Sequence, residues 1–222
     1  MSSGAPARFV AASFGTLAVV DLPAADDAAA CAVLAAGLLP EERAHADGLP
    51  EARRLTFAGG RLALRAALAL GAAAEPILST PRGGPMLPAG FAGSIAHKPT
   101  LAVALAARAP ADVTLGVDVE IDRASRFDLS TRVLTPAELR RHDALPSEDR
   151  ARAVLVAFAT KEAIYKALDP WLGRHVAFGE VEIEGRAAKL APRAGEPAFT
   201  IELDEVPLAG HILVTARVQR RG

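Results

Sequence analysis

The chain has 222 residues, of which 51% are hydrophobic and 23% charged, and its formal net charge is −1. This balance is typical of a globular protein with a sizeable core and excludes a largely disordered chain. The low net charge and the 5% of aromatic residues argue against nucleic-acid binding, which usually needs a basic face. No apolar run reaches the roughly 18–20 residues of a membrane span, and the single Cys31 allows no intramolecular disulfide. We therefore expect a cytoplasmic protein with neither nucleic acid nor membrane as a partner.

The first half of the chain is predicted to contain strands, helices and a long loop. Strands are expected over 9–13 and 16–20, an Ala-rich helix over 25–37, a long helix over 51–70, a loop over 72–92, and strands over 93–96 and 101–106. The segment 108–112 contains Pro110 and is typical of a linker, close to the middle of the chain.

The second half is predicted to follow a similar plan. A strand is expected over 113–121, a helix start at Thr135-Pro136-Ala137-Glu138, a long helix over 147–168, and strands over 176–184, 198–203 and 211–218. Strands and helices do not alternate as in a parallel α/β sheet. We predict an α+β fold made of two similar halves, 1–110 and 111–222, each with an antiparallel sheet packed on one long helix.

Two carboxylates lie on one face of the strand predicted over 113–121. Alternate residues of a strand share a face, so Asp118 and Glu120 lie together, roughly 7 Å apart, while Val117, Val119 and Ile121 face the core. Carboxylates that repel each other in a cleft are suited to a hard divalent cation such as Mg²⁺. From this segment alone, a solvated face of an edge strand is the simpler explanation of the same pattern.

The long helix over 147–168 carries three further charged residues near its end. Glu162 and Lys166 are four residues apart and share a face, and Lys161 precedes them. A helix salt bridge between Glu162 and Lys166 is the simplest explanation. The apolar surroundings instead favour partly buried charges, for which a metal or a lysine would be the partner.

Basic residues gather in the first half. His97 and Lys98 end a predicted strand, Arg54 and Arg61 lie near one face of the long helix, and Arg82 lies in a Gly-Pro turn. Arginine is well suited to phosphate, although solvated surface arginines and a surface histidine are common. Together with the carboxylates, these residues favour Mg²⁺-assisted displacement at phosphorus.

Three segments resemble the motifs of the 4′-phosphopantetheinyl transferases, most closely the monomeric type that activates surfactin and enterobactin synthetases. They are Ser94-Ile95-Ala96-His97, Gly116-Val117-Asp118-Val119-Glu120 and the run from Phe158 to Ala167 with the sequence FATKEAIYKA. The resemblance implies a monomeric pseudo-dimer that binds coenzyme A between its halves. The implied reaction moves phosphopantetheine to a serine of an acyl or peptidyl carrier protein and releases adenosine 3′,5′-bisphosphate.

The resemblance also implies a role for each candidate residue. Asp118, Glu120 and Glu162 would hold Mg²⁺, Glu162 would act as general base, and Lys166 would neutralise the pyrophosphate. Lys161, Arg54, Arg61, Arg82, His97 and Lys98 would hold the phosphates of coenzyme A. Ala96 replaces a serine that is common in the family.

Several questions stay open at the level of sequence. A Mg²⁺-dependent pyrophosphohydrolase or a non-catalytic module that binds coenzyme A would use much of the same set. The sequence does not say which of Arg53 and Arg54 contacts coenzyme A. It also does not say whether the carriers belong to fatty-acid, polyketide or nonribosomal peptide synthesis or to secondary metabolism.

Overall fold

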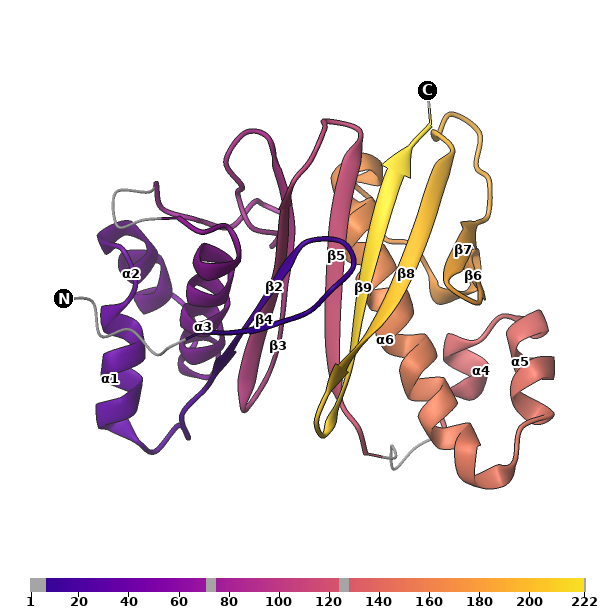
Figure 1. Cartoon of the computed structure of the whole chain (residues 1–222), viewed down its shortest axis with the longest axis horizontal. Coiled ribbons are helices and arrows are strands. Elements are labelled where there is room, and N and C mark those ends of the chain that lie inside the picture. The colour runs from indigo at the N-terminus through magenta and orange to yellow at the C-terminus, as the bar shows by residue number, and fades with distance from the viewer. Residues whose placement is uncertain (1–6, 71–74, 124–127, 222) are drawn as a thin grey trace. The chain divides into compact units, whose positions relative to one another are not determined.

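The computed structural model describes residues 7–70, 75–123 and 128–221, so part of the predicted loop over 72–92 lies outside the described residues. The chain divides into two units, Met1–Ala109 and Pro110–Gly222, each with its own sheet and helices (Figure 1). The boundary falls within the segment 108–112. No helix among the described residues is both long and apolar enough to cross a membrane.

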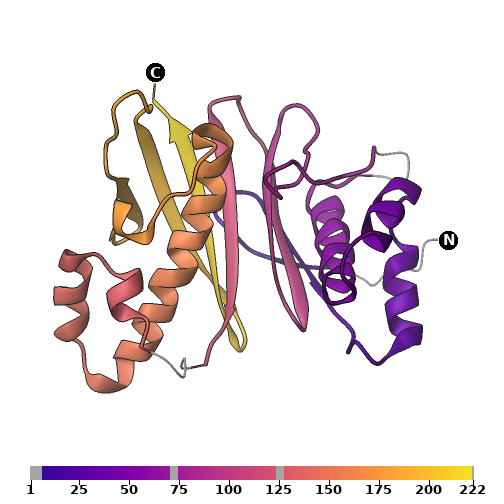
Figure 2. The ribbon, with the colours of Figure 1, turned by 180° about the vertical axis from the view of Figure 1, so that it is seen from behind.

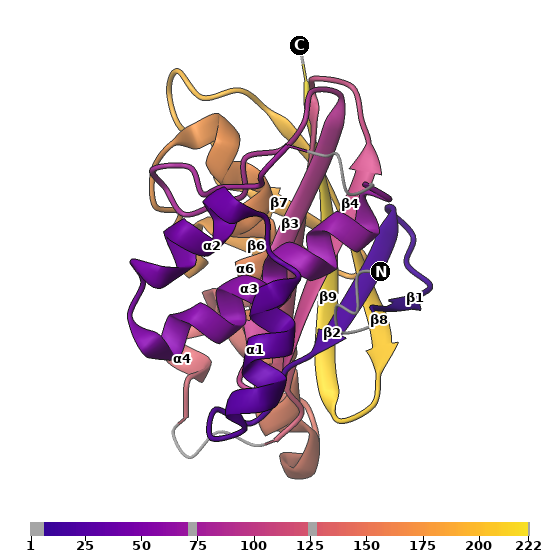
Figure 3. The ribbon, with the colours of Figure 1, turned by 90° about the vertical axis from the view of Figure 1, so that its left-hand side faces the viewer.

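The first unit is a four-stranded antiparallel sheet with helices stacked on one face, in front of β2, β3 and β4 in Figure 3. The sheet order is β1 (Arg8–Val10), β2 (Thr16–Asp21), β4 (Leu101–Arg108) and β3 (Phe91–Lys98). The helices are α1 (Ala28–Ala36), α2 (Pro40–Asp47) and α3 (Glu51–Ala67). Helix α3 packs on the sheet, where its buried Leu64 meets the alternate alanines of β4, and α1 and α2 pack on α3.

The second unit is a five-stranded antiparallel sheet crossed on one face by a single long helix, α6 (Ser147–Leu172) (Figure 2). The sheet order is β5 (Val113–Ile121), β9 (His211–Arg220), β8 (Phe199–Leu208), β7 (Ala187–Leu190) and β6 (Val181–Glu184). The short helices are α4 (Ser130–Val133), α5 (Pro136–Asp143) and the 3₁₀ turn η1 (Phe178–Glu180). Fully buried Ala159, Ala163 and Ala167 allow α6 to lie close to the sheet.

This architecture confirms the predicted α+β class, with two antiparallel sheets that each pack on one long helix. The capping box at Thr135 is confirmed, because its hydroxyl accepts a hydrogen bond from the Glu138 backbone N–H while the Glu138 carboxylate accepts from the Thr135 N–H. The strand predicted over 176–184 is wrong in its first part, where the chain forms η1 before β6. Helices α2 and α4 and strand β7 were not predicted.

The prediction for the two faces of β5 needs a correction. Residues paired across antiparallel strands share a face, and Asp118 pairs with Val214, which belongs to the core beneath α6. The carboxylate face of β5 therefore faces α6. Val117 and Val119 are buried on the opposite face of the sheet, and Ile121 is exposed.

Both units contain the same buried acidic anchor at the start of a short helix. In the first unit Glu42 is fully buried and accepts hydrogen bonds from the Leu39 and Ile77 N–H groups and from the Arg65 guanidinium. In the second unit Glu138 accepts from the Thr135 and Ile183 N–H groups and from the Lys161 ammonium. Each carboxylate thus joins a short helix, a later segment and the long helix of its unit.

Replacing Glu42 by glutamine is expected to lower the free energy of unfolding by about 1.5–3 kcal/mol, the usual value of hydrogen bonds to a charged group. The variant leaves the Arg65 cation in the interior without its carboxylate. Glu41→Gln is the matched control, because Glu41 is the preceding residue and is exposed. Urea unfolding of both variants measures the difference, and equal stabilities would contradict the role of the anchor.

Candidate active site

The site is built where β5 lies against α6, and a glycine allows the two to meet. A Cβ atom at Gly116 would overlap the backbone carbonyl of Ala163, so only glycine fits at this position. One pleat earlier, the Thr114 hydroxyl donates to the Ala167 carbonyl over 2.6 Å. These contacts fix the register of β5 against α6 and bring the polar residues that follow Gly116 beside the middle of the helix.

Asp118 and Lys166 form the central ion pair of this site. The Lys166 Nζ atom lies 2.7 Å from Asp118 Oδ1 and 3.0 Å from the Val117 carbonyl oxygen. Lys166 therefore pairs with the neighbouring strand, and the simple helix salt bridge with Glu162 is not the arrangement found. The second oxygen of Asp118, Oδ2, is buried and has no hydrogen-bond partner among the described residues.

Glu162 is partly buried close to the same carboxylates. Burial raises the pKa of Glu162, the negative charges of Asp118 and Glu120 raise it further, and the Lys166 ammonium opposes the rise. The charges of Asp118, Glu120 and Lys166 thus act on Glu162, and the metal and base roles of this group stay predictions. His175, which the sequence analysis does not single out, opposes the rise in the Glu162 pKa electrostatically. Its ring lies against the Tyr165 ring, with the two centroids 5.8 Å apart.

The carboxylates fit a hard cation by their chemistry, although they do not form a ready-made cage. No three His, Cys, Asp or Glu side chains within residues 7–70, 75–123 and 128–221 converge as a metal site. The buried, unpartnered Oδ2 of Asp118 nevertheless offers an oxygen ligand, and a cation would relieve the repulsion that raises the Glu162 pKa. Asp118, Glu120 and Glu162 are thus suitable Mg²⁺ ligands.

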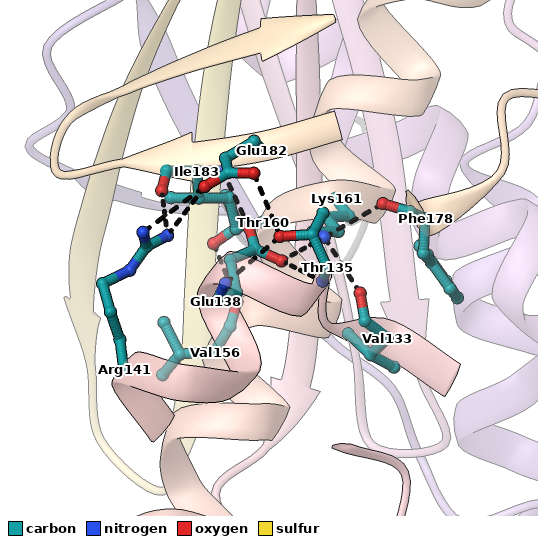
Figure 4. A network of polar contacts seen from close by, with 10 residues as sticks. All are labelled: Val133, Thr135, Glu138, Arg141, Val156, Thr160, Lys161, Phe178, Glu182 and Ile183. Atoms are coloured by element: carbon teal, nitrogen blue, oxygen red, sulfur yellow. Dashed lines mark hydrogen bonds and ion pairs between the residues drawn. The ribbon is translucent and has the colours of Figure 1, made fainter. Parts of the chain in front are cut away.

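Lys161 lies elsewhere, although it precedes Glu162 in the chain. Its side chain is only 1% exposed, and Figure 4 shows its ammonium group among Val133, Glu138 and Phe178. All three partners accept hydrogen bonds from Nζ, and burial lowers the Lys161 pKa while Glu138 opposes that effect. The expected contact between Lys161 and a phosphate does not fit this geometry.

Two arginines predicted to bind coenzyme A are occupied within the first unit. Arg54 donates to the Asp47 and Leu49 carbonyls at the end of α2, as Arg150 does at the end of α5 in the second unit. Arg61 is buried and donates to the Ile77 carbonyl and the Ser79 hydroxyl, and burial lowers its pKa to about 10. These hydrogen bonds support the fold. For the exposed Arg54 a role toward phosphate stays a prediction, whereas the buried Arg61 has little surface to offer a ligand.

The remaining basic candidates lie at the edges of elements. His97 and Lys98 end β3, with His97 exposed, and Arg82 lies in a tight turn closed by a hydrogen bond from the Thr80 N–H to the Gly84 carbonyl. All three take part in polar or electrostatic interactions. Their placement leaves their role toward phosphate a prediction.

A pocket of about 770 Å³ lies between α5, α6 and strands β6 and β8 of the second unit. Its walls include Leu134, Val156 and Leu203, and its rim includes Arg141 and Arg152. Both rim arginines are already paired with carboxylates. None of the predicted metal carboxylates lines this pocket, so we place the candidate active site at β5 and α6 instead.

Comparisons with known proteins place both units in one family. Residues 41–107 match the 4′-phosphopantetheinyl transferase N-terminal domain, and residues 114–205 match the 4′-phosphopantetheinyl transferase superfamily. The second match contains Asp118, Glu120, Glu162 and Lys166. The chain belongs to the 4′-phosphopantetheinyl transferase superfamily.

Individual relatives support the same family. The chain is 34% identical over 158 residues to the 4′-phosphopantetheinyl transferase Svp of Streptomyces mobaraensis. The matched region covers 66% of this chain and 60% of that protein. It is 33% identical over 96 residues to a holo-acyl-carrier-protein synthase of Geobacillus kaustophilus, covering 38% of this chain and 73% of the relative. A Staphylococcus aureus synthase of the same name is 40% identical over 75 residues, or 31% of this chain and 63% of the relative.

Proposed function

We propose that this protein transfers 4′-phosphopantetheine from coenzyme A to a serine hydroxyl of an apo carrier protein. The observation that carries the proposal is the group formed by Asp118, Glu120, Glu162 and Lys166 on two elements held together at Gly116. Two of the relatives are named for the acyl carrier protein, which supports a carrier of this kind as the partner. The same chemistry would serve carriers of polyketide or peptide synthesis.

In the proposed reaction, the serine oxygen bonds to the phosphorus atom that bears pantetheine. The bond from that phosphorus to the adenosine part breaks, and adenosine 3′,5′-bisphosphate leaves with the electron pair. Glu162 accepts the serine proton, directly or through a water molecule. Its raised pKa suits this role because a base works best when its pKa approaches the working pH.

Charge must be neutralised while the diphosphate is cleaved. Lys166 uses two hydrogen bonds to hold Asp118 and the Val117 carbonyl, and its side chain keeps 28% of its surface exposed to reach a phosphate oxygen. Asp118, Glu120 and Glu162 would hold Mg²⁺. The ion would neutralise the diphosphate and polarise its oxygens. His97, Lys98 and Arg82 of the first unit stay the proposed contacts for the remaining phosphates.

A transfer assay tests the proposal directly. The protein is incubated with coenzyme A, Mg²⁺ and a panel of apo acyl and peptidyl carrier proteins, and each carrier is weighed by mass spectrometry. We expect a mass gain of one phosphopantetheine group on at least one carrier, its loss on adding EDTA, and its return with excess Mg²⁺. Release of adenosine bisphosphate without a carrier would indicate a pyrophosphohydrolase, and binding of coenzyme A without either product would indicate a binding module.

A further inference from the structure

The Lys161 ammonium is the point where four separate segments of the second unit meet (Figure 4). Its Nζ atom lies 2.9 Å from the Val133 carbonyl oxygen at the end of α4 and 3.0 Å from the Phe178 carbonyl oxygen in η1. The third partner is Glu138 Oε2 in α5, at 2.6 Å. An ammonium group has three N–H donors, so these contacts use all of them.

Glu138 extends this connection to the sheet. Its Oε2 atom also accepts from the Thr135 N–H over 2.7 Å, and its Oε1 atom accepts from the Ile183 N–H of β6 over 2.8 Å. Both side chains of the pair are at least nine-tenths buried. Because each polar atom is satisfied, the pair holds α6 in one position against α4, α5, η1 and β6.

The first unit contains a buried acid–base pair of the same kind, but no candidate metal carboxylate next to it. Glu42 and Arg65 form the matching buried pair there, and the first unit contains none of the three predicted metal carboxylates. The pair in the second unit is therefore part of the architecture shared by the two units. This argues that Lys161 acts on the fold of α6 rather than on a ligand.

The next residue along α6 is Glu162. Successive helix residues are separated by about 100°, so a helix whose rotation is fixed at Lys161 also has Glu162 and Lys166 fixed in direction. Asp118 on β5 is the partner that Lys166 meets in this orientation. The contacts with β5 would still hold the helix on the sheet, but loss of the Lys161 contacts would let it shift slightly. A shift of about 1 Å in a catalytic group can cost about 100-fold in rate.

We propose that Lys161 is a positioning residue that acts through Glu138 to hold α6 so that Glu162 and Lys166 face Asp118. The inference rests on the proposed transferase function for its kinetic consequences. It replaces the phosphate-binding role expected for Lys161 with a role inside the protein.

The test compares Lys161→Met, Glu138→Gln and the double variant in the transfer assay. We expect each single variant to lower kcat by about 10- to 100-fold, as for a misplaced catalytic group. The KM for coenzyme A is expected to stay within about 3-fold in all three proteins, because no ligand contact is removed. The double variant is expected to lose no more kcat than the worse single variant, since both substitutions break one connection.

Stability measurements keep the test decisive if a single variant unfolds easily. Each single substitution leaves one buried charge without its partner, whereas the double variant removes both charges. Thermal unfolding should therefore show a lower Tm for each single variant and a partial recovery in the double variant. Lys189→Met is the matched control, because Lys189 is exposed and pairs with Glu184 at the surface, and it should keep wild-type kcat and Tm.

Three results would overturn the inference. A rise in KM for coenzyme A with kcat retained in Lys161→Met would restore a direct phosphate contact. Losses of kcat that multiply in the double variant would show that Lys161 and Glu138 act independently, and an unchanged kcat in a folded Lys161→Met protein would remove the positioning role. A wild-type chain that modifies no carrier would overturn the proposed function instead, and the Tm recovery would still report on the buried pair.

Discussion

Replacing Glu162 by glutamine is expected to reduce phosphopantetheine transfer by about 100- to 10,000-fold, the range associated with a general base. Glutamine keeps the size of the side chain but accepts no proton and binds a cation weakly. Initial rates with coenzyme A and a responsive apo carrier measure the loss. Retention of activity would remove Glu162 from both the base and the metal-ligand roles.

The same substitution is expected to stabilise the protein slightly at neutral pH, because it removes a charge that burial and two neighbouring carboxylates disfavour. A carboxyl whose pKa is higher in the folded state binds more protons there than in the unfolded state. The free energy of unfolding of the wild type therefore falls as the pH rises from the usual Glu pKa through the raised one. Above that interval the Glu162 charge lowers the free energy of unfolding of the wild type by its full amount. The glutamine variant carries no charge there and is not destabilised in this way.

Urea unfolding at a series of pH values checks this sign. The advantage of Glu162→Gln should shrink as the pH is lowered toward the usual glutamate pKa, because wild-type Glu162 then becomes neutral as well. Glu148→Gln is the control on the same helix, since Glu148 is exposed in the first turn of α6. A glutamine variant less stable than wild type at neutral pH would contradict the electrostatic account.

Replacing Gly116 by alanine is expected to lower the free energy of unfolding by at least about 3 kcal/mol, the upper range for overpacking a core. The added methyl group would collide with the Ala163 backbone, which cannot move aside as a flexible side chain can. Strand β5 would separate from α6, so transfer activity should fall with stability. Circular dichroism during thermal unfolding and the transfer assay measure the two effects.

Gly179→Ala provides the matched control for Gly116→Ala. A Cβ atom at Gly179 meets no atom within 4 Å, and its backbone does not have a positive φ. This control should unfold close to the wild type and keep its activity. Equal behaviour of the two variants would show that the contact between Gly116 and Ala163 does not support the fold.

The sequence predicts the elements whose ends carry strong local signals. The strand over 113–121 agrees with β5 at both ends, and α5 begins directly after the capping threonine at position 135. Helix α2 has the same proline and glutamate spacing, but Leu39 stands in the cap position without a side-chain acceptor. Because Leu39 has no hydroxyl group, the start of α2 lacks the local signal that the capping threonine gives to α5.

The candidate site group was predictable because its residues combine strand and helix periodicity with charge. Asp118 and Glu120 share a face by the two-residue period of β5, and Glu162 and Lys166 share one by the helical period of α6. Which face of β5 meets α6 was not predictable from alternation alone. That choice depends on Gly116, whose importance appears only once the helix backbone lies against it.

The basic residues show what a local sequence leaves undetermined. A guanidinium group that binds phosphate and one that binds backbone carbonyls have the same local sequence, and the structure shows carbonyl contacts for both Arg54 and Arg61. Lys161 and Lys166 lie on the same helix, yet one is buried against Glu138 and the other reaches Asp118. The difference comes from α4, α5 and β5, which are distant in sequence.

The pairing of β5 with β9 also determines when the site can form. Val113 pairs with Gln219 and Glu120 with Ile212, so the first strand of the second unit depends on its last. During synthesis on the ribosome, the strand that carries Asp118 and Glu120 emerges long before residues 211–220 exist. Its hydrogen-bonding edge stays open until then, and distant pairings of this kind fold slowly. We therefore expect the carboxylate group to assemble only after residues 211–220 have emerged and paired with β5.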